Sequence, residues 1–121
     1  VYANLEVAQP YREQVDKGMG AVVEQISRGA RDQLDDAEAT ALGREVILNS
    51  GGGTAVGEFL TRWCARSPRP LVLLLDEVDA LVGDTLFSLL RQLRAGYPQC
   101  PTAPSTSRPN RCGWTISMPT R

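Results

Sequence analysis

Two adjacent carboxylates, Asp76 and Glu77, follow a run of five aliphatic residues at positions 71–75. Such a run is typical of a strand buried inside a parallel sheet, and it places the residues that follow at the carboxyl edge of that sheet. Magnesium prefers oxygen ligands and keeps several of its waters. The pattern therefore predicts a site at which Asp76 supports a hydrated magnesium ion and Glu77 orients or deprotonates an attacking water.

Two other interpretations of these acids stay open. The first is a core strand that simply ends in solvated acids, because strand ends often carry aspartate. Against it stand the second acid, a further acid at Asp79, and a helix expected a few residues later with Asp84 as its cap. The second is a magnesium cluster for another phosphoryl reaction, in which Asp76, Glu77 and Asp79 are joined by Glu6 from a neighbouring strand end.

The rest of the chain must supply the elements that position these acids. Alternation at the start of the sequence predicts a strand, and helical spacing of apolar residues predicts four helices. The expected elements are a strand over 1–7, helices over 11–34 and 36–48, a flexible glycine-rich break at 49–53, a helix after Thr54, a strand over 70–76 and a helix over 85–95. We expect strands 1–7 and 70–76 to be parallel in an α/β fold. Of residues 98–121, only 114–118 could form a short strand.

A family resemblance rests on residues 73–81, Leu-Leu-Leu-Asp-Glu-Val-Asp-Ala-Leu, and on the helix predicted after them. This segment resembles the Walker B element of AAA+ ATPases and of AAA-like bacterial ATP-binding proteins. The resemblance is specific over 71–94 and covers roughly 1–97. It implies an incomplete three-layer, parallel-sheet P-loop NTPase-like fold, with ATP and Mg²⁺ as cofactors of the complete parent protein. It also implies that Asp76 is the metal-side acid and that Glu77 polarises the hydrolytic water.

The chain departs from that family at the phosphate-binding loop. No Gly-x-x-x-x-Gly-Lys-Ser/Thr motif is present, and the only lysine is Lys17. Residues 51–57 are rich in glycine but lack the lysine, so a linker is the better interpretation. Arg91 and Arg94 are interpreted as a solvated helix face, not as residues acting on a neighbouring subunit. We therefore expect a Walker B fragment, residues 1–97, that is inactive alone, followed by an irregular, disordered or non-native tail, 98–121.

Bulk composition limits the other classes. The chain has 121 residues, 42% hydrophobic and 22% charged, with a formal net charge of −1, which gives no nucleic-acid signal. No apolar run approaches the roughly 18 residues that cross a bilayer. The absence of histidine removes the usual general base. We expect a cytoplasmic protein with a protein partner or a homo-oligomer, and with an N-terminal region missing from this sequence. A non-enzymatic α/β interaction module is the alternative function.

Overall fold

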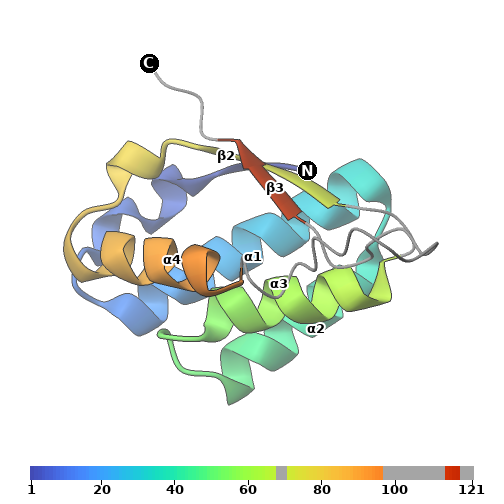
Figure 1. Ribbon diagram of the computed structural model, residues 1–121, viewed down its shortest axis with the longest axis horizontal. Coiled ribbons are helices and arrows are strands. Elements are labelled where there is room, and N and C mark those ends of the chain that lie inside the picture. The colour runs from blue at the N-terminus through green and yellow to red at the C-terminus, as the bar shows by residue number, and fades with distance from the viewer. Residues whose placement is uncertain (68–70, 97–113, 118–121) are drawn as a thin grey trace, which may run out of the picture.

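The computed structural model describes residues 1–67, 71–96 and 114–117. Most of these residues are helical (Figure 1). In chain order the elements are β1 Tyr2–Asn4, the 3-10 helix η1 Leu5–Tyr11, α1 Val15–Leu34, α2 Ala37–Asn49, α3 Ala55–Arg66, β2 Leu71–Asp76, the 3-10 helix η2 Val78–Ala80, α4 Gly83–Gly96 and β3 Trp114–Ser117. None of the helices in the described ranges combines the length and apolarity that a membrane span requires.

The sheet is short and parallel, with the strand order β1-β2-β3 among the described residues. Tyr2 lies opposite Leu74, and Asn4 lies opposite Asp76, so the carboxyl ends of β1 and β2 meet at one edge. The predicted pairing of the first strand with the aliphatic strand is therefore confirmed. The first strand is shorter than the predicted 1–7, because the Asn4 side chain accepts a hydrogen bond from the Glu6 amide at 2.9 Å and starts η1.

The predicted three-layer P-loop NTPase-like fold is wrong. Helices α1 to α4, the α-helices of the described ranges, lie on one side of the sheet (Figure 1). Along β2, Leu73 and Leu75 are each 1% exposed, whereas Val72 is 52% exposed. Helices α2 and α3 pack against α1 instead of covering the second sheet face, and their buried side chains belong to the same core. The described part of the chain is therefore a predominantly helical layer with one small sheet on top of it.

The helices follow the predicted periodicity, with shifted ends. Helix α1 begins at Val15, four residues later than predicted, because Pro10 lies inside η1 and not in the first turn of α1. Helix α4 begins at Gly83, so Asp84 lies in its first turn and is not its cap. The shared core is built from alternate strand residues and from one face of each helix.

The predicted tail falls mostly outside the described residues. Residues 97–113 and 118–121 lie outside the described residues, and so do Cys100 and Cys112. The described piece, Trp114–Ser117, forms β3 and runs parallel to β2, with Ile116 opposite Leu73. A strand lies where the sequence allowed one.

The glycine-rich break between α2 and α3 is held in place by the core. Gly52 is buried, and its amide donates to Asp16 Oδ1 at 2.7 Å. Its carbonyl accepts from Gln92 Nε2 at 2.7 Å, and Gln92 Oε1 in turn accepts from the Gly57 amide at 3.0 Å. Residues from α1, α3 and α4 are thus joined through one backbone unit. The predicted flexible break is wrong at Gly52.

Within this loop, only position 52 requires glycine, because Asp16 of α1 lies too close to leave room for a side chain there. A Cβ at Gly52 would lie 2.6 Å from Asp16 Oδ1 and 2.7 Å from the Asp16 backbone. We expect Gly52→Ala to lower the free energy of unfolding by about 2 kcal/mol, because the helix backbone must move to admit a methyl group. The midpoint of urea unfolding measures this change.

The neighbouring glycines provide matched controls. A Cβ at Gly51 or Gly53 would meet nothing within 4 Å. Gly51→Ala and Gly53→Ala should change the free energy of unfolding by no more than about 0.5 kcal/mol. Equal effects at all three positions would contradict the packing described for Gly52.

Candidate functional site at the carboxyl edge of the sheet

The edge of the sheet where β2 ends carries the predicted acids. Asp76 is half-buried and is the last residue of β2. The Tyr2 hydroxyl donates to Asp76 Oδ2 at 2.6 Å, and the Glu77 amide donates to Asp76 Oδ1 at 2.9 Å. Each carboxylate oxygen can accept a second hydrogen bond or a metal-bound water. The Asp76 carboxylate is therefore oriented by two donors and keeps acceptor capacity.

Tyr2 is a residue of this edge that the sequence argument missed. Its backbone amide donates to Gln33 Oε1 at 2.9 Å, and its carbonyl accepts from Gln33 Nε2 at 2.9 Å. The side-chain amide of Gln33, in the last turn of α1, thus forms the two backbone hydrogen bonds with Tyr2 that a neighbouring strand would otherwise form. Because Tyr2 lies opposite Leu74, its ring reaches Asp76 diagonally across the strand pair. Only the strand register identifies this contact.

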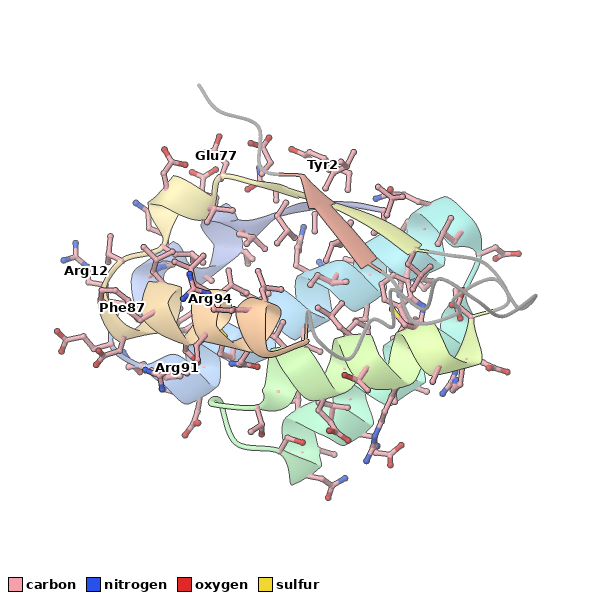
Figure 2. The ribbon with its side chains drawn as sticks, in the orientation of Figure 1. Tyr2, Arg12, Glu77, Phe87, Arg91 and Arg94 are labelled. Carbon is pink, nitrogen blue, oxygen red and sulfur yellow. The ribbon has the colours of Figure 1, made fainter. Side chains whose placement is uncertain are left out.

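The two acids lie on a sheet face that none of the described helices covers. Figure 2 shows Tyr2 and Glu77 on the side of the sheet that faces away from the helices. Side chains alternate along a strand, so Asp76 shares its face with Val72 and Leu74, which are 52% and 39% exposed. A ligand at Asp76 would be reached from the uncovered side of the sheet.

Glu77 has an unusual backbone conformation. Its φ of 59° and ψ of 33° fall in the left-handed region, which costs a residue with a side chain about 1–2 kcal/mol. The Glu77 carbonyl accepts from the Ala80 amide at 3.0 Å, and this bond closes the turn into η2. Strained backbone positions are often found at functional sites. This conformation makes Glu77 a candidate for a functional role, and the chain changes direction at Glu77 as β2 ends.

The alternative metal cluster does not assemble. Asp79 is exposed on η2, and Glu6 is exposed on η1, so the strand-tip neighbour of Asp76 is Asn4. Within the described ranges, no three side chains of the metal-binding types His, Cys, Asp and Glu come together. A hydrated magnesium ion needs only one or two protein carboxylates when phosphates supply other ligands. The geometry is compatible with such a partial site and gives no support to a four-acid cluster.

The phosphate side of a nucleotide site is not found near these acids in the described part of the chain. Lys17 is exposed on α1. The loop of Gly51–Gly53 lies on the far side of the helical layer from the sheet (Figure 1), and the Gly52 amide is already bound by Asp16. Arg91 and Arg94 are exposed on α4, as predicted for a solvated face (Figure 2).

Some polar and aromatic side chains away from this edge have structural roles. In the acidic segment 32–38, Asp36 caps α2 by accepting from the Ala39 amide at 3.1 Å. Its second oxygen accepts from Trp63 Nε1 at 3.0 Å, so this carboxylate ties α2 to α3. Trp63 and Cys64 are 2% and 1% exposed, so both are core residues.

Comparison with known protein families, with curated proteins and with solved structures gave no match. The resemblance of residues 71–94 to a Walker B segment is therefore a resemblance of sequence alone.

The strain at Glu77 can be measured by a comparison of glycine with alanine. Both Glu77→Gly and Glu77→Ala remove the carboxylate, but only glycine adopts the left-handed conformation without cost. We expect the glycine variant to be more stable than the alanine variant by about 1 kcal/mol. Chemical unfolding of the two proteins gives this difference.

Asp79, two residues along the chain, is the control. It has no positive φ, and it lies inside η2. Asp79→Gly should be less stable than Asp79→Ala by about 0.5–1 kcal/mol, the opposite order. The same order at both positions would show that Glu77 carries no backbone strain.

Proposed function

We propose that this chain contributes the magnesium-facing acids of an ATP-hydrolysing site. The observation that supports the proposal is the pair of adjacent carboxylates at the end of β2, with the Asp76 side chain oriented by Tyr2 at 2.6 Å. In the complete parent protein, Asp76 would hold a water of a magnesium ion bound to the nucleotide phosphates. Glu77 would orient the attacking water.

The residues of this edge suit the metal better than they suit the nucleotide. Carboxylate oxygens are ligands that magnesium prefers, and the hydroxyl of Tyr2 fixes one of them. When bound, the ion would neutralise charge on the phosphates. The sequence has no Gly-x-x-x-x-Gly-Lys-Ser/Thr motif, so the groups that hold the phosphates must come from another chain or another segment.

Binding of magnesium to the edge can be tested by linkage. A ligand that binds only the folded protein stabilises it by about 1.4 kcal/mol when its concentration is ten times Kd. We expect Mg²⁺, added at constant ionic strength, to raise the unfolding free energy of the wild-type chain until the site saturates. Asp76→Asn should abolish this increase, because a neutral amide attracts the cation far less than a carboxylate does. The carbonyl oxygen of the new side chain can still accept from the Tyr2 hydroxyl, so the variant should keep the fold of this edge.

Glu38→Gln is the matched control for charge. The Glu38 side chain is 84% exposed on α2 and its carboxylate pairs with Arg66 at 3.0 Å, outside the sheet edge. This variant should keep the full response to Mg²⁺. A response of equal size in the wild type, Asp76→Asn and Glu38→Gln would show that the ion acts on the general charge of the protein, and the proposal would fail.

Catalysis requires more than the acids. Positioning and charge stabilisation of the phosphates supply most of the rate of phosphoryl transfer. We therefore expect the 121-residue chain to release no phosphate from ATP above the rate of buffer containing magnesium. Turnover that Glu77→Gln removes would contradict this expectation.

One observation favours a second function, a protein-interaction module. The open face of the sheet exposes Tyr2, Val72 and Leu74 beside one another on β1 and β2. In this case the acids would only form the polar rim of a contact surface. Saturable stabilisation by Mg²⁺ that depends on Asp76 distinguishes the two functions.

A further inference from the structure

A pocket between α1 and α2 lies outside the acidic edge. The two helices form a hairpin joined by Asp35 and Asp36. They cross closely where Gly43 meets Ser27, since a Cβ at Gly43 would lie 3.1 Å from Ser27 Oγ. The pocket opens beside this crossing and has a volume of about 430 Å³. That size is within the range of small-molecule sites in proteins, roughly 300–1,000 Å³.

The pocket is lined by more positive than negative charge. Arg28, Arg31 and Arg44 contribute three guanidinium groups, and Glu24 contributes the one carboxylate of the lining. Arg28 pairs with Glu24 at 3.0 Å, and Arg31 pairs with the neighbouring Asp32 at 3.1 Å. The side chains of both pairs are more than half exposed, so these pairs are weak and can exchange for a ligand.

Arg44 makes no ion pair with the described residues, and its guanidinium is the strongest anchor available to an anion. Guanidinium groups bind phosphate and carboxylate oxygens through two parallel hydrogen bonds. With Asp32 counted beside Glu24, three guanidinium groups face two carboxylates, so the pocket attracts an anion. It suits a dianion when Arg28 or Arg31 exchanges its partner for the ligand.

A buried hydroxyl points to a ligand at the same place. Thr40 Oγ1 is inaccessible to solvent and has no hydrogen-bond partner among the described residues, although Thr40 lines the pocket. Nearly all buried polar groups in proteins are hydrogen-bonded, so such an atom calls for a partner. Because Oγ1 is closed to solvent in this rotamer, a ligand oxygen in the pocket would accept from it after rotation about χ1 turns the hydroxyl toward the pocket, which Arg44 also lines.

The end of the pocket at the last turns of α2 is apolar. Ile47 and Leu48 line it, and they are 37% and 83% exposed. An apolar body attached to the anion would cover these two side chains and remove them from water. The ligand is therefore expected to be charged at one end and apolar at the other.

We propose that the α1–α2 pocket binds a small soluble phosphate monoester with an aromatic or aliphatic body. The phosphate lies against Arg44 and the Thr40 hydroxyl, with Arg28 and Arg31 at the rim. The organic part covers Ile47 and Leu48. This assignment is independent of the role of Asp76 and Glu77, since the pocket and the sheet edge share no residue.

Phenyl phosphate is the probe for this site. Titration into ¹⁵N-labelled full chain should move the amide signals of residues 24–31 and 40–48 in a saturable way. Inorganic phosphate, which lacks the apolar body, should bind at least about fivefold more weakly because it leaves Ile47 and Leu48 exposed. No saturable shift with phenyl phosphate, or equal affinity for both anions, would overturn the proposal.

Two substitutions separate binding from folding. Arg44→Gln should lower the affinity for phenyl phosphate about tenfold, which is the usual effect of losing a charge-assisted hydrogen bond. Thr40→Val keeps the shape of the side chain and removes a hydroxyl that has no partner in the described protein. Thr40→Val should lower the affinity for phenyl phosphate severalfold, while the midpoint of unfolding stays the same or rises.

Arg91→Gln is the matched control. Arg91 is exposed on α4, and like Arg44 it makes no ion pair with the described residues, so the variant removes the same charge without breaking a pair. Its affinity for phenyl phosphate should stay within about twofold of wild type, as expected for a distant, screened charge. Equal losses in Arg44→Gln and Arg91→Gln would show non-specific attraction of the anion to surface arginines and would refute the site. Binding that occurs only on vesicles containing phosphatidate, and not with phenyl phosphate, would refute it also.

Discussion

The one-sided burial of β2 is the constraint on which the arrangement depends. Leu71, Leu73 and Leu75 enter the core with the helices, and the side chains between them face away. This alternation fixes the register with β1, in which Ala3 is buried and its neighbours Tyr2 and Asn4 lie on the other face. It therefore also brings the Tyr2 hydroxyl to Asp76. The acidic edge and the open sheet face are two results of the same packing.

Helix α1 supports both the acidic edge of the sheet and the α1–α2 pocket. Its last turn supplies Gln33, whose amide holds the backbone of Tyr2 at the edge of the sheet. One turn and more before it, Ser27 and Arg28 line the pocket shared with α2. The opposite, apolar face of α1 is buried in the core, with Met19 and Ile26 fully enclosed. A helix so constrained is a rigid support, and rigid supports favour well-positioned side chains over adaptable ones.

Local sequence signals predicted the elements well. Apolar spacing placed α1 to α4 to within a few residues of their observed ends, and the aliphatic run placed β2. Local patterns cannot reveal layering, because a run of five aliphatic residues looks the same whether one face or both faces are buried. The three-layer expectation failed for that reason. Similarly, the Gly51–Gly53 segment resembles a flexible break until the approach of Asp16 and Gln92 is known.

The sequence indicates the acids of the candidate site, but it does not indicate the side chains that position them. Asp76 and Glu77 were identified from their position after a hydrophobic strand. Tyr2 and Gln33 were not, because their contacts depend on strand register and on where α1 ends. The left-handed turn at Glu77 also has no sequence signal, since neither glycine nor asparagine marks it.

We propose that a divalent ion binds at the carboxyl end of β2, and paramagnetic Mn²⁺ tests this binding most directly. Mn²⁺ has the oxygen preference of Mg²⁺ and broadens NMR signals close to where it binds. We expect substoichiometric Mn²⁺ to broaden the amide signals of residues 2–4 and 75–79 first, and we expect Asp76→Asn to remove this effect. Broadening centred elsewhere in the chain, or unchanged in Asp76→Asn, would contradict the proposal.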